Sequence, residues 1–259
     1  MALMGNAPEP VVLLHGQPGG ARDWEPVRAA IGTRAQTIAL DRPGWDGRTA
    51  PTDLAGNARA ALAAMDARGA ERATIVGHSF GGAIAAWLAA FHPERVGALV
   101  LVAPAANLAS LYRLDYWLAA PVVGEVASVV TLAGLSVALT PRRVRGWVAA
   151  RLALDDRYLE TWARLLRAPA VWRAYAAEQR VLTRDLPVLE DRLTSLAAPT
   201  TIVAGTHDRV VPAAAAHELA AQIPGAELVL LDHAGHLLLH QQVGRMADLI
   251  VAAASARPA

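Results

Sequence analysis

The sequence predicts an α/β fold in which a mostly parallel β-sheet of about six strands carries helices on both faces. Short runs of consecutive apolar residues alternate with alanine-rich helical patterns, which is typical of parallel strands buried on both sides. Polar residues with reactive side chains directly follow several of these runs. The alternation stops once, at about residue 107, and resumes at about residue 199.

Each apolar run predicts one strand. In chain order the runs are Pro10–Leu14, Gln36–Leu40, Arg72–Val76, Arg95–Pro104, Thr200–Ala204 and Ala226–Leu231. Thr52 or Asp53 can cap an alanine-rich helix that Gly69 stops. A second apolar helix follows the third strand, over Gly82–Ala90.

The interruption divides the chain into a core and a cap. At 259 residues the chain is long enough for one sizeable core, which favours a single domain with an insertion. We expect residues 1–106 and 197–259 to form this core domain. Residues 107–196 carry helical patterns only, so we expect them to form a helical cap over the sheet edge where the reactive residues lie.

A serine lies in a tight turn between the third strand and its helix. The pentapeptide Gly77-His78-Ser79-Phe80-Gly81 has the G-x-S-x-G pattern of a nucleophile elbow. Such a turn holds the serine in sparsely populated backbone angles, and the flanking glycines let strand and helix approach closely. The hydroxyl is thereby held clear of the backbone, where a base can take its proton. Ser79 is the predicted nucleophile.

A base and an acid follow two later strands. Asp208 comes after the fifth predicted strand and His236 after the sixth. Because the carboxyl ends of parallel strands form one edge of the sheet, we expect both side chains near Ser79. Asp232 is the alternative acid, but it is only four residues before His236 on the same turn, a poor direction for reaching the imidazole Nδ1.

With these residues the chain resembles the α/β-hydrolase superfamily, in its group of serine hydrolases with a helical cap. It shares an HG-x-P loop at His15, a D-R-P-G turn at Asp41, a G-H-S-x-G-G elbow around Ser79 and a G-x-x-D acid site at Asp208. The order serine, acid, histidine is also that of the superfamily. The similarity covers roughly residues 10–105 and 197–252 and is specific for fold and catalytic machinery, not for substrate.

The chain departs from this family pattern in two places. After His236, family members often carry an acidic residue and a proline, and here the chain reads Leu-Leu-Leu-His-Gln-Gln, which leaves the start of the local helix undetermined. Family members also begin with two strands before the HG loop, whereas about nine residues precede the first strand here. We therefore expect a sheet that lacks one or both leading strands.

The resemblance implies an oxyanion hole made of two backbone amides. One is the N–H of Phe80, directly after the nucleophile, and the other is the N–H of Gln17 in the loop after the first strand. Pro18 has a fixed φ and no N–H, so it would hold the loop with the Gln17 amide turned inward.

Aromatic residues suggest where a substrate would bind. The cap holds all four tyrosines and four tryptophans, and collectively they indicate a pocket with an apolar wall, although aromatics at helical spacing are most often packing. The predicted pocket residues are Trp45, Tyr116, Trp117, Trp147 and Trp172.

One stretch of the cap is long and apolar enough to raise the question of a membrane span. Between Trp117 and Leu139 the only charge is Glu125. A proline and two glycines interrupt the stretch, so we expect two short amphipathic helices that face the pocket. A loose association of this surface with a membrane stays open.

Composition excludes several other classes of function. Net charge is +1 with no basic stretch interleaved with aromatics, so we expect no nucleic-acid partner. The chain has neither cysteine nor lysine, which excludes disulfides, thiolate chemistry and a lysine Schiff base. The histidines His233, His236 and His240 invite a metal site, but no nearby carboxylate pair completes a ligand set, and we expect no metal and no cofactor. The sequence shows no signal-peptide pattern, so we expect a cytoplasmic protein. We expect it to be a monomer or a homodimer.

These residues predict acyl transfer from a small, largely apolar carboxylic ester or lactone, by a Ser79–His236–Asp208 mechanism. The same three residues also serve carbon–carbon bond hydrolysis, cofactor-free perhydrolysis or haloperoxidation, and cyclase or lyase steps. A small-molecule receptor on a hydrolase scaffold is the alternative from another class. The sequence does not separate these functions, because one fold supports all of them.

Overall fold

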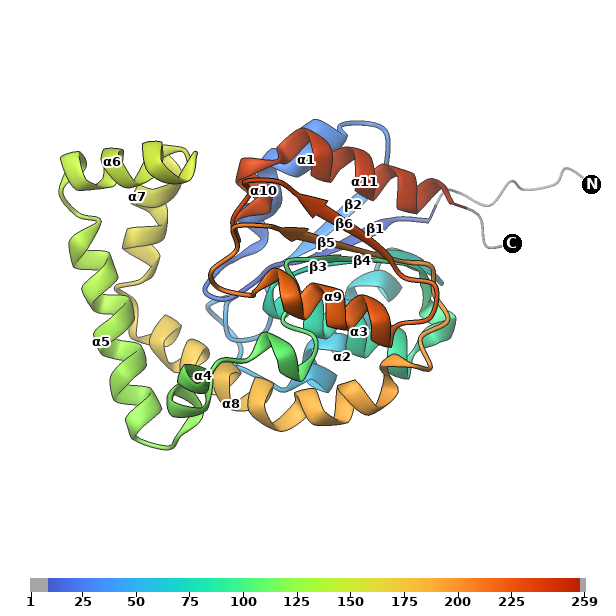
Figure 1. Ribbon diagram of the computed structural model, residues 1–259, viewed down its shortest axis with the longest axis horizontal. Coiled ribbons are helices and arrows are strands. Elements are labelled where there is room, and N and C mark those ends of the chain that lie inside the picture. The colour runs from blue at the N-terminus through green and yellow to red at the C-terminus, as the bar shows by residue number, and fades with distance from the viewer. Residues whose placement is uncertain (1–8, 257–259) are drawn as a thin grey trace, which may run out of the picture.

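A computed structural model describes residues 9–256 of the chain. Its centre is a sheet of six parallel strands in the order β2-β1-β3-β4-β5-β6 (Figure 1). This confirms the predicted fold class and the expected number of strands. The strands are β1 (Val11–Leu14), β2 (Thr37–Leu40), β3 (Ala73–His78), β4 (Val96–Val102), β5 (Thr200–Gly205) and β6 (Glu227–Leu231).

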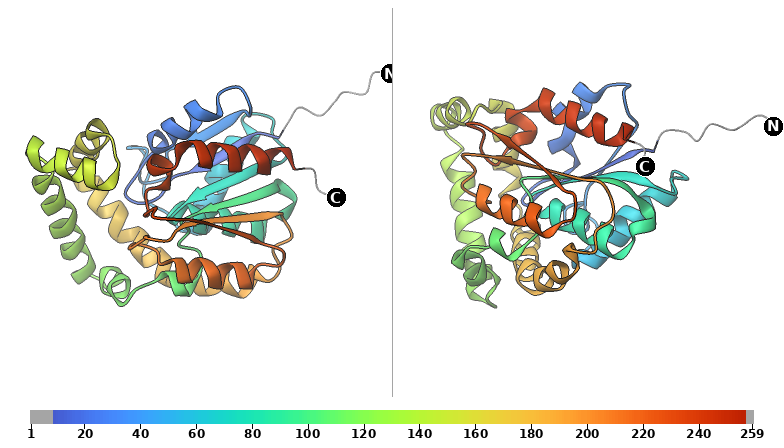
Figure 2. Two further views of the ribbon diagram at one scale, coloured as in Figure 1. Left: turned by 45° about the horizontal axis from the view of Figure 1, so that its top comes forward. Right: turned by 45° about the vertical axis from the view of Figure 1, so that its right-hand side comes forward.

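Helices cover both faces of the sheet (Figures 1 and 2). On one face lie α1 (Glu25–Ile31) and α11 (Val243–Ser255), and on the other lie α2 (Leu54–Asp66), α3 (Phe80–Phe91) and α9 (Ala213–Gln222). Successive residues of one strand point to opposite faces, so each strand contributes to two cores. Val12 and Leu14 of β1 pack with α2 and α3, whereas Val11 and Leu13 pack with α1 and α11.

The termini of several elements follow from local chemistry. The Asp53 side chain caps α2 by accepting a hydrogen bond of 2.6 Å from the Gly56 N–H, which selects Asp53 over Thr52. Gly69 follows this helix with a φ of +66°, a conformation that glycine adopts without a steric penalty. The short helix α10 (Leu238–Gln241) begins two residues after His236, where the family pattern left its start undetermined.

The segment 107–196 contains five helices and, in the described part of the chain, no strand. Figure 1 shows α4 to α7 set to one side of the sheet, with α8 running from this group back beneath it. These helices are α4 (Arg113–Ala119), α5 (Val123–Ala138), α6 (Arg142–Leu152), α7 (Asp156–Leu165) and α8 (Pro169–Leu193). Short 3₁₀ turns lie at Ala21–Trp24, Pro93–Arg95 and Leu108–Ser110.

Helix α8 belongs to both parts of the molecule. Its first half packs in a cap cluster through Val171, whereas its second half buries Leu182, Leu186 and Leu189 in the core cluster with α2 and α3. Residues 182–193 therefore hold the second half of α8 against helices that cover the sheet.

Among residues 9–256, no single helix combines the length and the hydropathy needed to cross a bilayer. Helices α4 and α5 meet the criterion only when taken together, and they are bent by 108° with respect to each other.

Candidate active site

Ser79 occupies a strained turn between β3 and α3. Its backbone has φ +54° and ψ −120°, a region that a residue with a side chain rarely adopts. Strand β4 and the segment after it hold this conformation: the Ser79 N–H donates to Val102 O at 2.9 Å, and Ser79 O accepts from the Ala105 N–H at 3.1 Å. The Ser79 residue is 6% exposed, at the carboxyl end of β3.

The glycines around Ser79 are required by close backbone approach. A Cβ on Gly77 would overlap the carbonyl of Gly81, and a Cβ on Gly81 would overlap the carbonyl of Leu14 on the neighbouring strand. A Cβ on Gly82 would lie 2.7 Å from the Pro104 side chain. The elbow therefore tolerates no larger residue at these positions.

Asp208 and His236 form a buried pair. His236 Nδ1 lies 2.8 Å from Asp208 Oδ2, and because a carboxylate only accepts, Nδ1 is the donor. The other oxygen of Asp208 accepts the N–H groups of Val210 and Val211 at 2.8 and 2.9 Å. These bonds fix the carboxylate and leave His236 Nε2 free to accept a proton. Asp232, the alternative acid, is exposed.

Three loops meet at Ser79. A Cβ placed on Gly16 would come 3.0 Å from Ser79 Cβ, so the loop after β1 lies directly against the elbow. His78, next to Ser79, donates from Nε2 to the carbonyl of His236 at 3.0 Å, and the two imidazole rings are 4.9 Å apart. These contacts place the His236 loop and the loop after β1 against the elbow that carries Ser79.

His78 is held neutral by its surroundings. Burial, followed by the neighbouring His236, lowers the pKa of His78 to about 3. A group with so low a pKa does not take up a proton near neutral pH, so His78 serves to position the His236 loop rather than to act as a base.

The two amides expected to bind an oxyanion lie on either side of this junction. Phe80 is the first residue of α3, and Gln17 follows Gly16 in the loop after β1. Within residues 9–256 neither N–H donates a hydrogen bond. A helix N-terminus and a second free amide are the kind of donors that stabilise a developing negative charge.

Arg42 fixes the loop that carries Gln17. The guanidinium donates from Nε to His15 O and from Nη2 to Gly16 O, both at 3.0 Å, and lies 4.7 Å over the Phe80 ring. The Arg42 N–H also donates to His15 Nε2 at 3.2 Å. Burial and the adjacent Arg42 charge hold the pKa of His15 well below its ordinary value, so His15 is a neutral structural acceptor.

Glu178 connects this loop to the cap. It lies fully buried on α8 and pairs with Arg42, and its Oε1 also accepts the indole N–H of Trp45 at 2.9 Å. Sequence reasoning missed this pair. The available signal was an acidic residue between Ala174 and Val181 on the apolar side of α8, where an unpaired carboxylate would be costly.

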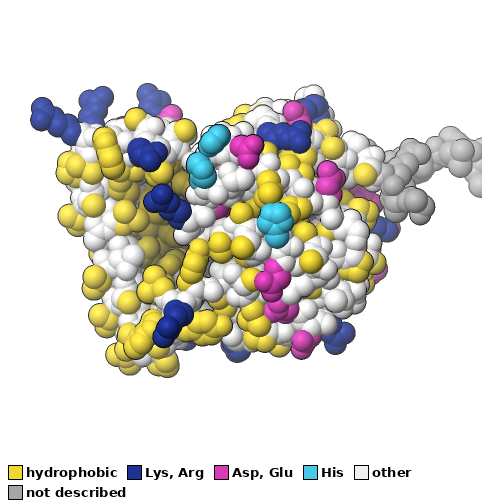
Figure 3. Space-filling model, viewed as in Figure 1, with side chains coloured by type: hydrophobic (Ala, Val, Ile, Leu, Met, Phe, Trp, Pro, Cys, Tyr) yellow, Lys and Arg dark blue, Asp and Glu magenta, His cyan; other side chains and the backbone are white. Residues whose placement is uncertain are grey.

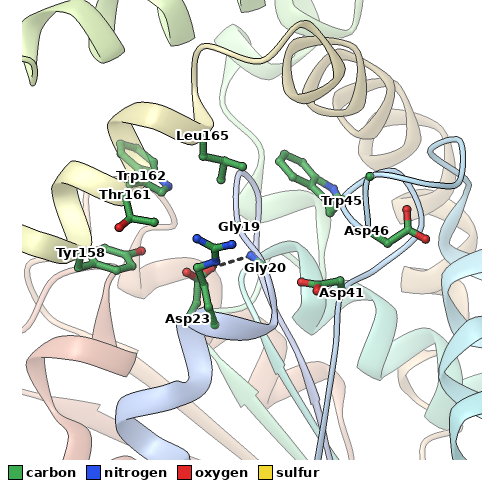
Figure 4. Close-up of a pocket in the computed structure, with 12 residues that line it drawn as sticks. Gly19, Gly20, Asp23, Asp41, Trp45, Asp46, Tyr158, Thr161, Trp162 and Leu165 are labelled. Atoms are coloured by element: carbon green, nitrogen blue, oxygen red, sulfur yellow. Dashed lines mark hydrogen bonds between the residues drawn. The ribbon is translucent and has the colours of Figure 1, made fainter.

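A cavity of about 270 Å³ opens beside the same loop (Figure 4). Figure 4 shows Trp45 on one side and Tyr158 and Trp162 of α7 on the other, with Asp23 and the Gly19–Gly20 backbone between them. The Trp162 indole N–H donates to Pro18 O at 3.4 Å, which ties α7 to the loop. Ser79 is not among the residues that line this cavity.

Asp23 is the buried carboxyl group of the cavity. It accepts the Gly20 N–H at 3.0 Å, and burial raises its pKa from 3.8 to about 6. The remaining charged lining residues are Asp41, Asp46 and Arg22, so acidic groups outnumber basic ones.

The predicted pocket residues fall into two groups. Trp45 lines the cavity, and Trp172 packs with it in the cap cluster, its indole N–H bonded to Leu166 O at 2.7 Å. In contrast, Tyr116, Trp117 and Trp147 are 53%, 64% and 67% exposed and do not line this cavity of the described structure.

Three further histidines make ring contacts with neighbouring side chains. His207 and His233 contact each other edge to face with ring centroids 5.1 Å apart. His240 packs on the ring of Tyr158 at 4.0 Å, and burial lowers its pKa to about 4.

Known proteins resemble this chain over most of its length. A family model for the alpha/beta hydrolase fold matches residues 9–242. A 2-hydroxy-6-oxononadienedioate/2-hydroxy-6-oxononatrienedioate hydrolase of Cupriavidus pinatubonensis is 30% identical, covering 90% of this chain and 82% of its own length. A putative carbamate hydrolase, RutD, of Klebsiella pneumoniae is also 30% identical, covering 87% and 84%. The crystal structure of a hydrolase from Pseudomonas aeruginosa superposes with a TM-score of 0.75 at 25% identity, covering 97% of this chain and 92% of that one.

Proposed function

This chain belongs to the α/β-hydrolase family, and we propose that it is a serine hydrolase of a small, largely apolar carboxylic ester or lactone. The observation that carries the proposal is the 2.8 Å bond between His236 Nδ1 and Asp208 Oδ2, beside the strained Ser79 elbow. A buried carboxylate that fixes the histidine tautomer, next to a serine, is the arrangement that activates a hydroxyl as a nucleophile.

The proposed reaction has two stages. His236 Nε2 takes the Ser79 proton while Oγ attacks the substrate carbonyl carbon, and Asp208 stabilises the imidazolium. The N–H groups of Phe80 and Gln17 bind the oxyanion. His236 then gives its proton to the leaving alcohol, and water, deprotonated by the same histidine, releases the acid from Ser79.

Carbon–carbon bond hydrolysis is the second candidate. It is favoured by the 30% identity to a relative named as a hydrolase of a 2-hydroxy-6-oxo-dienedioate. Acyl transfer from an ester or lactone needs only an activated serine, a base and oxyanion donors, so we place it first.

Labelling with a fluorophosphonate probe tests the nucleophile. Ser79 should be labelled, and Ser79→Ala should abolish labelling, whereas Ser110→Ala should leave it unchanged because Ser110 is a buried serine bonded to Asn107 O. Labelling that survives Ser79→Ala would overturn the proposed role of this residue.

The acid and base are tested by turnover of p-nitrophenyl esters of increasing chain length. His236→Ala should reduce turnover about as far as Ser79→Ala, because the residues act as one unit. Asp208→Asn should reduce it by roughly 10⁴-fold, as in the worked serine-protease case, and Asp232→Asn should leave it near normal. The reverse result would move the acid role to Asp232.

The same panel separates the reaction classes. Turnover of short esters supports the esterase proposal, and cleavage of a 2-hydroxy-6-oxo-dienoate with no ester turnover supports carbon–carbon hydrolysis. A labelled Ser79 with neither activity supports a receptor or a more specialised reaction.

We also propose that the cap made by residues 107–196 sets the substrate through its contacts at the cavity. Trp162→Ala, on α7 of the cap, should reorder the chain-length preference, because pocket contacts discriminate by about 1–3 kcal/mol per methylene-sized difference. Trp147→Ala is the matched control, since Trp147 is 67% exposed. A preference order that Trp162→Ala leaves unchanged and Trp45→Ala alters would assign the choice of substrate to the core loop instead of the cap.

A further inference from the structure

Helix α5 of the cap carries its apolar face outward. Its buried residues follow a four-residue spacing and include two serines: Gly124, Ser128, Leu132 and Ser136. Its outer side carries valines. Val126, Val130 and Val137 are 59%, 66% and 69% exposed. A helix of a globular protein normally shows the opposite arrangement, with its apolar stripe facing the core.

Exposed aromatic residues lie on the helices before and after α5. Trp117 stands on α4, at 64% exposure, and Trp147 stands on α6, at 67% exposure. Figure 3 shows hydrophobic side chains spread over this side of the molecule. We call this region the outer cap surface and define it by Trp117, Val122, Val126, Val130, Val137 and Trp147. Exposed apolar side chains that gather on one side of a protein are a feature of interaction sites.

The charges around the outer cap surface are mainly positive. Between residues 113 and 152 the chain has five arginines and two acidic residues. Arg113, Arg142 and Arg143 are exposed and form no ion pair with any residue that the structure describes. The single acidic residue of α5, Glu125, is already paired with Arg180 at 3.4 Å.

We propose that the outer cap surface docks on an anionic lipid bilayer. The valines of α5 would lie at the boundary between headgroups and acyl chains, and the unpaired arginines would contact lipid phosphates. Tryptophan is enriched at this depth of a membrane because its ring is apolar and its N–H is polar. The 108° bend between α4 and α5 prevents the pair from crossing the bilayer as one rod, so the helices lie along its surface.

Flotation of the purified full chain with vesicles tests the proposal. The protein should float with vesicles of equal parts phosphatidylcholine and phosphatidylglycerol, and much less with phosphatidylcholine alone. Arg142→Ser combined with Arg143→Ser should weaken binding about 30-fold, at about fivefold for each arginine near a charged bilayer. Raising the salt concentration should weaken the binding of the unmodified protein in the same direction.

Two further variants distinguish binding through the apolar face of α5 from nonspecific binding through other exposed apolar residues. Val126→Glu combined with Val130→Glu should abolish flotation, because it places two charges in the part that inserts. Val188→Glu, at a valine that is 48% exposed on the core-anchored half of α8, should float like the unmodified protein. Circular dichroism and unfolding curves should be unchanged in all variants, since every altered side chain is exposed. Tryptophan fluorescence should shift to the blue on adding the mixed vesicles.

Three results would overturn the proposal. The first is that the unmodified protein does not float with mixed vesicles, and the second is that the double valine variant still floats. The third is that no form of the protein floats, while the unmodified protein is a dimer and the double valine variant is a monomer. The last result would identify a second copy of this chain as the occupant of the outer cap surface.

Discussion

Loss of the buried ion pair between Arg42 and Glu178 should lower the stability of the fold and loosen the loop after β1 that carries Gln17. Both side chains are almost fully buried, at 2% and 0% exposure, and they join the loop after β2 to the cap helix α8. The perturbation with the clearest expected effect is Glu178→Ala. It removes the carboxylate and leaves the guanidinium in place, still bonded to His15 O and Gly16 O.

The expected magnitude follows from what remains buried. Removing one partner of a buried ion pair leaves an uncompensated charge and costs about 3–5 kcal/mol. Glu178→Ala also removes the acceptor of the Trp45 indole N–H, a bond of 2.9 Å. We expect the free energy of unfolding to fall by about 4 kcal/mol, near the middle of that range. Glu178→Gln should cost less, about 2 kcal/mol, because an amide oxygen still accepts from Arg42 or Trp45.

Urea unfolding of a double-mutant cycle measures this coupling. The cycle comprises Glu178→Leu, Arg42→Met and their combination, and the combined variant should be more stable than the sum of the single losses predicts. Arg180→Ala is the control, because its pair with Glu125 is exposed and should contribute less than about 1 kcal/mol. A loss below about 1 kcal/mol for Glu178→Ala, or strict additivity in the cycle, would refute the reasoning.

Three further predictions concern residues outside this pair. Burial raises the pKa of Asp23 from 3.8 to about 6, so ionisation of Asp23 destabilises the fold as the pH rises through that interval. In urea unfolding, Asp23→Asn should therefore raise the free energy of unfolding by up to about 3 kcal/mol at pH 7. Below pH 3.8 it should not raise it. Gly81→Ala should lower stability by about 3 kcal/mol or prevent folding, because its Cβ would overlap the Leu14 carbonyl; a normal melting temperature would contradict the elbow geometry. Ser128→Val should destabilise by about 1–3 kcal/mol through overpacking, whereas Val130→Ser should change stability by less than about 0.5 kcal/mol; the opposite order in thermal unfolding would reverse the assignment of the buried side of α5.

The sheet, and the position of the candidate residues at the ends of its strands, were predictable because their signals are local. Each strand is a short apolar run, and Ser79, Asp208 and His236 each follow one, so the parallel arrangement brings them to one edge. The contact between Arg42 and Glu178 joins residues 136 positions apart, and the sequence around each residue does not indicate its partner. The sequence shows that a buried acid needs a partner and does not show which of many arginines provides it.

The orientation of α5 was not predictable for a different physical reason. Over residues 117–139 both sides of the helical pattern are largely apolar, so hydrophobic periodicity does not select a buried face. In the structure α5 packs on α4, α7 and α8 through Gly124, Ser128 and Ser136, whose small side chains allow close approach. The Ser136 hydroxyl gains a partner there by donating to Ala163 O at 2.7 Å. The close approach that small side chains allow, rather than hydropathy, therefore decides which side of α5 is buried. The valines are left on the outer cap surface, where their contact with water is unfavourable.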